Sequence, residues 1–468
     1  MSLTDSKDPS SAPAMQPGAD AAGPMSEQQP VYRVYKVRYL GLAQLVLLNI
    51  IISWDWLTFS AISTTSAEYF DVSESDVNWL STAALFAFVA ATPIVMYTLH
   101  HNVKTVMMIA SALVLVGNWM RFAGAKAQGG IFGLLMFGQL LIGFAQPFVL
   151  TAPTRYSDLW FTDRGRTSAT ALATLANPLG AALGQLIDSF WASQPDDIPD
   201  MVMWLAVIAT VAAAPSFFIP ARPPTPASAS SDVPKTPLVD SIQTVTRMPQ
   251  FWIIFFSFSV YVGFFNSVSA LINQIMFPYG FSETDAGIAG GVLIVVGLVA
   301  AAIMSPINDR FKIYLAMIRT CVPIHAAAHI AFIFAPSSPA GIAPSIVVCA
   351  LLGASAFSLL PVILELLVEI TYPASPEVGS TLCWMGGQLL GGIFTIVQTA
   401  LKAGPDADPP RNMRRSLIFS AVIAAVAAVP PLTLNVLGPK LVNRRLEADR
   451  RHGLSTTSLR EDQGEYKI

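Results

Sequence analysis

The sequence predicts an all-α membrane protein in which twelve transmembrane helices form two pseudo-symmetric six-helix bundles. Three observations lead to this fold class. Hydrophobic residues make up 53% of the 468 residues and charged residues only 12%, a composition too apolar for an ordinary soluble globule. Apolar runs of ~20 residues, long enough to cross a ~30 Å hydrocarbon core, recur along the chain. A segment rich in proline and serine divides these runs into two groups of six.

The first six runs define an N-terminal bundle over residues 36–220. Its first run, 40–60, follows a tail at 1–35 that is rich in Ser, Pro, Ala, Gly and Gln and is expected to be disordered. This tail lacks the apolar core of a cleaved secretory signal, so the first run is expected to be an uncleaved signal anchor. The other runs of this bundle are 78–99, 105–122, 131–153, 167–190 and 201–219.

The second group of runs defines a C-terminal bundle over residues 248–438. Residues 221–247 lie between the bundles, and their Pro/Ser-rich composition predicts a flexible cytosolic linker. Residues 439–468 are expected to be a cytosolic tail. The runs of the second bundle are 251–277, 286–307, 313–334, 342–367, 380–401 and 416–437.

Charged residues outside the runs indicate the orientation of the chain. Arg33, Lys36 and Arg38 precede the first run, which places the N-terminus in the cytosol by the positive-inside rule. Most predicted outer loops are acidic, although Arg121 and the arginines within 411–415 depart from this trend. We therefore expect both termini in the cytosol and a location in the plasma membrane.

The two halves resemble each other in sequence, which indicates an internal repeat. Ser73 follows the first run and precedes a new helix with acids in its first turn, and Ser282 does the same after the seventh run. Both patterns are typical of helix N-caps. A six-helix unit repeated around a central linker resembles the plan of the major facilitator superfamily. That resemblance implies secondary transport, in which one bundle rocks on the other around a substrate held near the membrane midplane.

Four motifs resemble a narrower family, the haem and choline transporters related to the feline leukaemia virus subgroup C receptor. They are WDWLTFS at 54–60, GFAQPFVL at 143–150, SALINQ at 269–274 and ELLVEITYP at 365–373, the last leading into Gly387-Gln388. The resemblance extends over both halves of the chain. It implies passive or weakly coupled movement of choline, ethanolamine or a related small metabolite, with haem export as the other activity attributed to the family.

The same resemblance implies a set of substrate-binding residues. In choline-handling members an aromatic cage that includes a first-helix tryptophan holds the quaternary ammonium, and that position matches Trp56. Glutamines that line the cavity of the family match Gln146 and Gln388. The cage tyrosine of the seventh helix aligns with Asn266, which is a departure, although Tyr261 lies about a turn and a half earlier on the same helix.

Asp55 is a second departure, because relatives usually have a glutamine at this position. It lies in the apolar body of the first run, where an ionisable group is costly unless it faces the protein interior or a water-filled cavity. We expect Asp55 to face the cavity beside Trp56 and either to neutralise an amine or to take up a proton that couples transport to the proton gradient. The alternative is a structural acid buried against a hydroxyl or a backbone amide. Trp54 lies two residues from Trp56 and is expected to point to another face of the helix.

Four amides within apolar runs are further candidates for the cavity. They are Gln146, Asn177, Asn273 and Gln388. The alternative for each is a hydrogen bond between helices, worth ~1 kcal/mol.

A cytosolic gate is predicted from charges at the inner ends of the runs. Glu365 and Glu369 are one helical turn apart, and their expected partners are Arg155, Arg164 and Arg166 at the equivalent end of the fourth run. Ion pairs between these groups would form and break as the bundles rock. A static surface salt bridge is the alternative.

A short loop after the eighth run resembles a cytosolic motif of the superfamily. Asp309 and Arg310 carry this resemblance. The counterpart in the first half, His100-His101, lacks the acid and the arginine, and it would make gating there sensitive to pH near neutrality.

No metal or cofactor is expected. His325 and His329 are one turn apart, a spacing that can ligate a metal or haem iron, but their helix is usually peripheral in this fold and a packed pair is favoured. The chain has three cysteines, without a CxxC pair or a zinc spacing, and these are interpreted as packing residues.

The absence of a nucleotide loop, a nucleophile elbow and an HExxH motif argues against an enzyme. The expected partners are a small-molecule substrate and the lipid bilayer, without nucleic acid, and the protein is expected to be a monomer. Alternatives to amine transport are haem export, proton-coupled efflux of a metabolite or drug and, more remotely, a receptor that does not transport.

Overall fold

The computed structural model describes residues 35–436 except 128, 162, 226–236, 312 and 372–373. Within these residues the chain is helical, and twelve segments are long and apolar enough to cross a membrane. The fold class predicted from the sequence is confirmed. Apart from Tyr35, the two predicted tails lie outside the described residues.

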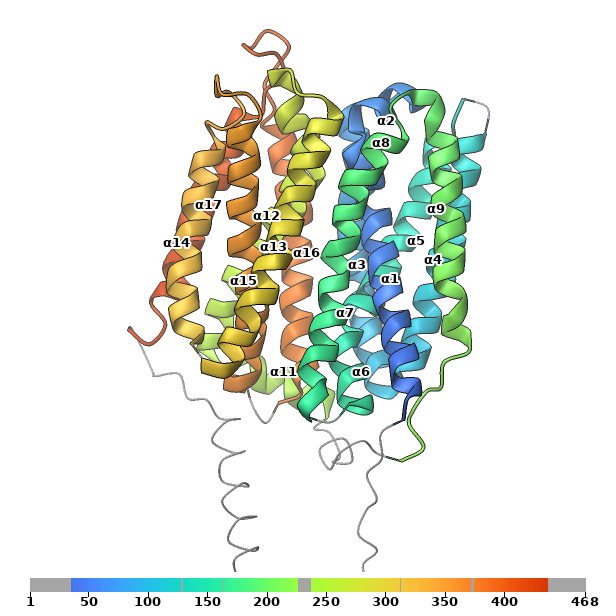
Figure 1. The fold of residues 1–468 in the computed structure, drawn as a ribbon, viewed down its shortest axis with the longest axis vertical. Helices are drawn as coiled ribbons and strands as arrows, with labels where there is room; N and C mark the ends of the chain where they lie inside the picture. Colours follow the sequence, from blue (N-terminus) through green and yellow to red (C-terminus); the bar gives the residue numbers. More distant parts are fainter. Residues whose placement is uncertain are drawn as a thin grey trace, which may run out of the picture.

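The first bundle contains six spans (Figure 1). Their helices are α1 (Val37–Ala61), α3 (Glu74–His101), α4 (Val103–Lys126), α5 (Phe132–Leu150) with α6 (Ala152–Trp160), α7 (Asp163–Leu183) with η1 (Gly184–Asp188) and α8 (Ser189–Trp191), and α9 (Ile198–Ala213) with η3 (Ala214–Phe217). The short elements α2 (Ser63–Phe70) and η2 (Pro195–Asp197) connect spans at the end where α1 stops. We call this the outer end, following the predicted orientation.

The second bundle repeats this plan beside the first (Figure 1). Its helices are α12 (Pro249–Met276) with η4 (Phe277–Tyr279), α13 (Glu283–Phe311), α14 (Tyr314–Phe332), α15 (Ala343–Thr371), α16 (Pro376–Ala400) and α17 (Arg414–Leu432). Helix α11 (Leu238–Thr246) lies in the segment expected to be a flexible linker. That expectation is wrong for these residues, because α11 buries Ser241 and Val245 and packs against α16.

The outer ends of α3 and α13 are capped in the same way, as the repeat predicts. The Ser73 hydroxyl accepts from the Asp76 amide (3.2 Å), and the Asp76 carboxylate accepts in return from the Ser73 amide (3.0 Å). In the equivalent pair, the Ser282 hydroxyl accepts from the Asp285 amide (3.1 Å), and the Asp285 carboxylate accepts from the Ser282 amide (3.0 Å). These capping boxes satisfy amides that a helix start leaves without partners, so the N-cap prediction is confirmed.

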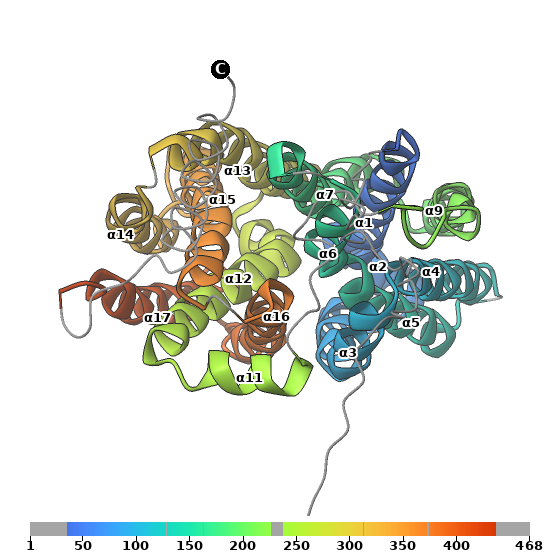
Figure 2. The same ribbon diagram turned by 90° about the horizontal axis from the view of Figure 1, so that it is seen from below.

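The two bundles meet most extensively where α13 packs against α7 and η1 and where α3 packs against α16 (Figure 2). Glycines permit the close approach of the first pair. A Cβ atom added to Gly287 would lie 2.5 Å from the carbonyl oxygen of Gln185, and one added to Gly291 would lie 2.5 Å from the side chain of Leu186. The interface therefore depends on residues that have no side chain at these positions.

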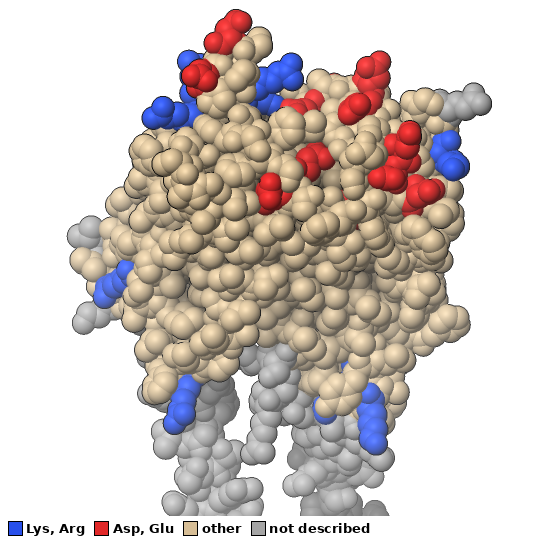
Figure 3. Space-filling view, turned by 45° about the horizontal axis from the view of Figure 1, so that its top comes forward, with Lys and Arg blue, Asp and Glu red and all other residues tan. Residues whose placement is uncertain are grey.

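On the face shown in Figure 3, the surface between the two ends of the molecule carries few charged side chains. Large apolar side chains are exposed along the helices there, among them Ile94, Val299 and Val422. Such a surface matches hydrocarbon rather than water. The apolar belt therefore agrees with a multi-pass membrane protein.

Candidate functional site

A cavity lies between the two bundles, near the middle of the spans. The space bordered by its lining residues is about 750 Å³, a figure that includes open solvent at its mouth. Helices α1, α5 and α7 line it from the first bundle, and α12, α15 and α16 from the second. Aromatic and amide side chains are prominent in its wall, and the described lining residues include no charged group. The aromatic residues are Trp56, Phe258, Tyr261, Phe265, Phe357 and Trp384, and the amides are Gln146, Asn177, Asn266 and Gln388.

Six of the eight residues predicted to bind substrate line this one cavity. They are Trp56, Gln146, Asn177, Tyr261, Asn266 and Gln388. The motifs thus located the helix faces that meet between the bundles. Substrate binding by these residues stays a prediction.

The tryptophans of α1 point to different faces, as their spacing predicts. Trp56 faces the cavity, and its Nε1 donates to the carbonyl of Ser81 (3.3 Å), which orients the indole ring. Trp54 turns toward η1, where its Nε1 donates to a carboxylate oxygen of Asp188 (2.8 Å). Only one of the two rings is therefore presented to the space between the bundles.

The amides of the cavity differ in how far their hydrogen bonds are satisfied. Asn266 Nδ2 donates to Gln388 Oε1 (2.7 Å), which ties α12 to α16. Gln146 Oε1 and the Tyr261 hydroxyl are buried without a hydrogen-bond partner. Because a buried polar atom is costly without a partner, these two groups are available to a molecule in the cavity.

Asp55 does not line the cavity, so the expectation that it faces the substrate is wrong. Its carboxylate pairs with Arg121 Nη1 of α4 (3.0 Å) and accepts from Asn118 Nδ2 (2.6 Å), and both ionic side chains are 0% exposed. Successive residues of a helix point ~100° apart, so Asp55 turns into the first bundle while Trp56 faces the cavity. Arg121, which departs from the positive-inside trend, lies inside a span as the partner of this acid.

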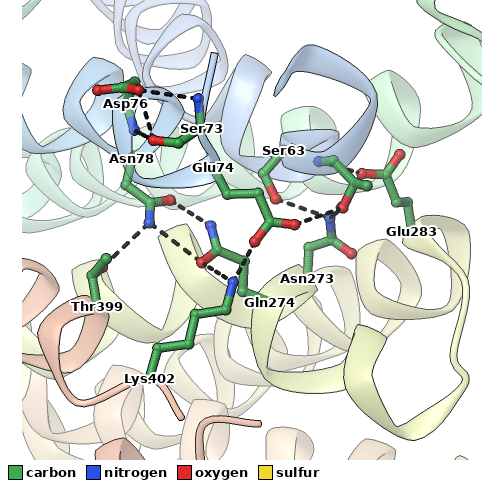
Figure 4. Close-up of polar contacts among 11 residues, drawn as sticks. Ser63, Ser73, Glu74, Asp76, Asn78, Asn273, Gln274, Glu283, Thr399 and Lys402 are labelled. Atoms are coloured by element: carbon green, nitrogen blue, oxygen red, sulfur yellow. Dashed lines mark hydrogen bonds and ion pairs between the residues drawn. The ribbon is translucent and has the colours of Figure 1, made fainter. Parts of the chain in front are cut away.

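Asn273 also lies away from the cavity, at the outer end (Figure 4). Its Nδ2 donates to the Ser63 hydroxyl (3.0 Å) and to Glu283 Oε1 (2.8 Å). Glu283 of α13 in turn accepts from the hydroxyl and the amide of Thr65 in α2. Asn273 is thus part of a contact between the bundles rather than of the cavity wall.

A second set of polar contacts joins the bundles beside Asn273 (Figure 4). Glu74 of α3 forms an ion pair with Lys402, which follows α16. Gln274 Nε2 donates to Asn78 Oδ1 (2.7 Å), and Asn78 Nδ2 donates to Thr399 Oγ1 (3.2 Å). We refer to the contacts of Glu74, Asn78, Gln274, Glu283 and Lys402 as the outer gate. It holds the outer ends of the bundles together beyond the cavity.

Sequence reasoning placed the gate only at the cytosolic end and missed this one. A signal was nonetheless present, because Glu74 and Glu283 each directly follow a capping serine, Ser73 and Ser282. A residue in the first turn after a cap sits at the rim of its bundle. In this structure each of the two acids reaches across to the opposite bundle.

The predicted cytosolic gate is described only in part. The side chains of Glu365, Arg166 and Asp309 lie outside the described residues. Glu369 is buried on α15, and Arg155 is half-buried on α6. Pairing between these groups stays a prediction. Asp309 and Arg310 belong to the last turn of α13, so the expectation of a loop at these residues is wrong. The Arg310 guanidinium lies over the ring of Phe311 (5.5 Å).

The histidine pair of α14 is packed inside the second bundle. His325 Nδ1 is 2.9 Å from the Ser355 hydroxyl, and its ring lies against Tyr261 with the centroids 4.9 Å apart. The ring of His329 contacts Phe264. Among the described residues no group of three or more His, Cys, Asp or Glu side chains is arranged to hold a metal ion. Of the first-half pair, His101 is exposed and the side chain of His100 lies outside the described part of the chain.

Comparison with known sequences gives one family and several relatives. A profile of the Major Facilitator Superfamily matches residues 45–396. Solute carrier family 49 member A3 of Danio rerio is 32% identical over 398 residues, which are 84% of this chain and 84% of that relative. Choline/ethanolamine transporter FLVCR1 of Felis catus is 27% identical over 405 residues, which are 82% of this chain and 71% of that relative.

Comparison with solved structures gives the same fold. A bacterial homologue of the human lysosomal transporter Spinster, inward-facing and unoccupied, superposes with a TM-score of 0.62 at 16% identity, over 86% of this chain and 97% of that chain. The transporter FucP in the outward conformation superposes with a TM-score of 0.60 at 15% identity, over 85% of this chain and 99% of that chain. At these identities the likeness establishes the arrangement of helices and nothing finer.

Proposed function

Because this chain belongs to the major facilitator superfamily and is therefore a secondary transporter, with twelve candidate spans among its described residues, we propose that it carries a small organic cation of the choline or ethanolamine type. The cation occupies the central cavity and crosses the membrane as the bundles rock against each other. Similarity to the choline/ethanolamine transporters supports this substrate class.

The single observation that carries the proposal is the uncharged, aromatic lining of the cavity. A quaternary ammonium has no N–H to donate, so hydrogen-bond acceptors do not recognise it, whereas each aromatic face attracts it by about 0.5–2 kcal/mol. Trp56 comes from the first bundle, and Tyr261 and Trp384 come from the second. A bound cation therefore offers both bundles a shared partner.

The amides suit the hydroxyl group that choline and ethanolamine have in common. Gln146 Oε1 lacks a protein partner and accepts from the substrate hydroxyl in this proposal. The pairing with Asn266 occupies Gln388 Oε1 and leaves Gln388 Nε2 as a donor. Asn177 adds a further amide to the same wall.

Choline is the favoured substrate of the two. The primary ammonium of ethanolamine gives up water at three N–H groups on entering the cavity, and Asp55 is not there to receive it, because its carboxylate is held by Arg121. A quaternary ammonium loses no hydrogen bonds to water, and the aromatic wall compensates for its desolvation.

Haem export is disfavoured by the same lining. Haem carries two propionate groups, and no cationic side chain lies among the described residues of the wall. Two carboxylates would enter this space without a countercharge, at a large cost in free energy.

We also propose a second gate at the cytosolic end. Glu365 and Glu369 on α15 would pair with Arg155 and Arg166 when the outer gate opens, so that the cavity is never open to both sides. Asp309 and Arg310, in the last turn of α13, would stabilise the same end. The transporter is proposed to act as a monomer in the plasma membrane, with both termini in the cytosol.

Transport by the purified full-length chain in liposomes tests the proposed function. We expect uptake of labelled choline that exceeds uptake of ethanolamine and that tetramethylammonium inhibits, with protein-free liposomes as the control. Haem uptake without choline uptake would overturn the substrate class. If no organic cation enters the liposomes, the receptor alternative gains support.

A further inference from the structure

Three ionisable side chains lie buried inside the first bundle, and the cavity does not use them. Asp55 belongs to α1, Arg121 to α4 and Asp188 to η1, and all three are 0% exposed. Arg121 and Asp55 form the ion pair described above, and Trp54 donates to Asp188 Oδ1. The cluster thus holds two carboxyl groups and one guanidinium away from water.

The charges of the cluster do not balance if both acids are ionised. An arginine side chain keeps its proton at any physiological pH. Two carboxylates would therefore leave one negative charge without compensation in a place that water does not reach, which is strongly unfavourable. One of the two acids must hold a proton for the cluster to be neutral.

The hydrogen bonds indicate which acid holds the proton. The carboxylate of Asp55 forms an ion pair with the Arg121 guanidinium through Oδ1 (3.0 Å) and accepts a hydrogen bond from the Asn118 amide at Oδ2 (2.6 Å), so it is well stabilised as an anion. Asp188 has Trp54 as a donor to Oδ1, and its Oδ2 is buried without a hydrogen-bond partner. The proton therefore belongs on Asp188.

Other charged groups near η1 do not balance the charge of Asp188 or hold the proton in its place. Helix η1 packs against α1, α7, α8 and α13, and the charged groups that act on Asp188 are Arg121 and Asp55. On α13, Glu283 is engaged in the outer gate and Asp285 caps the helix. The charged residues of α7, at 163–166, lie at its cytosolic start and Arg38 lies near the equivalent start of α1.

Asp188 lies on the same short π-helical segment that contacts the other bundle. Gln185, three residues earlier, donates through Nε2 to the carbonyl of Ser269 in α12 (2.6 Å), and Gly287 and Gly290 of α13 pack against it. This contact must separate when the outer gate opens. Single π-helical turns within a span often mark functional positions.

We propose that Asp188 is a proton-binding site loaded from the outer side. When η1 and α13 separate, water reaches the carboxylate, a proton from that water adds to Asp188 Oδ2, and the resulting O–H leaves the cluster with Asp55 as its only anion. The neutral cluster then permits the outer end to close. Loss of the proton to outer water restores the surplus negative charge and favours the open outer end. Acid outside therefore speeds the step that carries substrate inward.

Infrared spectroscopy of the purified full-length chain tests the site without any substrate, because a neutral carboxylic acid absorbs apart from a carboxylate. We expect a neutral carboxyl band that Asp188→Asn removes, since the amide keeps an oxygen for Trp54. Asp55→Asn should remove the same band, because Asp188 then becomes the carboxylate partner of Arg121. The exposed acid Asp196 of the outer loop supplies the matched control, and Asp196→Asn should leave the band unchanged. A band that persists in Asp188→Asn would overturn the proposal.

The pH dependence of transport gives a second readout, and this one rests on choline being carried. Uptake by the parent should rise by up to about tenfold for each unit by which the outer pH falls toward the point of half-protonation and should level off below it, and Asp188→Asn should remove the dependence. Asp188→Glu should restore it in part. If choline is not carried, the infrared result still decides the proton site. Uptake by Asp188→Asn that keeps the pH dependence of the parent would contradict the proposal.

Discussion

At the scale of single residues, Trp56 is the side chain on which cation recognition depends most. The hydrogen bond from its Nε1 to Ser81 fixes the indole with its ring toward the cavity before any substrate arrives. A ring that is already oriented loses little conformational entropy on binding. Trp204, which is 54% exposed on α9, provides a tryptophan of the same size outside the cavity.

Trp56→Ala should therefore weaken choline binding about 10- to 30-fold, the upper range of one cation–π contact. Inhibition of labelled choline uptake by unlabelled choline measures the change. Trp56→Phe should keep most of the affinity because an aromatic face remains. Trp204→Ala should bind as the parent does, and equal losses in Trp56→Ala and Trp204→Ala would exclude a specific role for Trp56.

Arg121 matters at the same scale for stability rather than recognition. Arg121→Met leaves Asp55 and Asp188 without a cation, and removal of one partner of a buried ion pair costs about 3–5 kcal/mol. We expect a clear fall in the melting temperature of the detergent-solubilised protein. The double variant Asp55→Asn/Arg121→Met removes both charges of the pair and should recover much of the loss. No recovery in the double variant would mean that Arg121 stabilises the bundle by packing alone.

At the scale of helices, each bundle contributes one acid to the outer gate. Each acid directly follows a capping serine, and its side chain contacts the other bundle. Glu74 reaches Lys402, and Glu283 reaches Thr65. The capping boxes hold the first turns of α3 and α13, so each acid is positioned by its own helix start. The repeat thus produces two equivalent latches.

Glu74→Gln should favour opening of the outer end. The Glu74–Lys402 pair is about one-fifth exposed, so its loss should cost ~1 kcal/mol, or about fivefold in the ratio of closed to open molecules. Spin labels at the exposed positions Ser75 and Asp406, in a background without the native cysteines, report the distance across the gate. The exchanged pair Glu74→Lys/Lys402→Glu should restore the closed distance, and failure to do so would argue against an electrostatic latch.

At the same scale, the contact between α13 and η1 is the second feature that determines whether the outer end closes. A Cβ at Gly287 would meet the Gln185 carbonyl oxygen at 2.5 Å, whereas one at Gly133 of α5 would meet nothing within 4 Å. Gly287→Val should therefore keep the outer ends apart and reduce uptake at least tenfold, while Gly133→Val should transport normally. Normal uptake by Gly287→Val at equal expression would show that the interface adapts without affecting transport.

At the scale of the whole molecule, much of the architecture could be predicted from the sequence. Apolar runs of spanning length locate the helices because the bilayer fixes their length and composition. The motifs around Trp56, Gln146 and Gln388 identify the cavity because these residues lie on the faces that the two bundles turn toward each other. Both inferences use local patterns that the fold preserves.

Other features depend on contacts between distant segments and were not predictable in this way. The direction of Asp55 is decided by Arg121, 66 residues later, because a buried acid turns toward the available cation. The outer gate joins Glu74 to Lys402, which lie 328 residues apart. A single sequence does not indicate which distant residues come into contact. These pairs can therefore be identified only in the folded structure.

The most direct measurement is a structure of the protein determined by electron cryomicroscopy in a bilayer mimic with saturating choline. We expect density for one choline in the central cavity, with its ammonium against the ring of Trp56 and its hydroxyl near Gln146, and with no carboxylate in contact. Density for choline outside the cavity, or an empty cavity in a preparation that transports choline, would contradict the assignment of the substrate site.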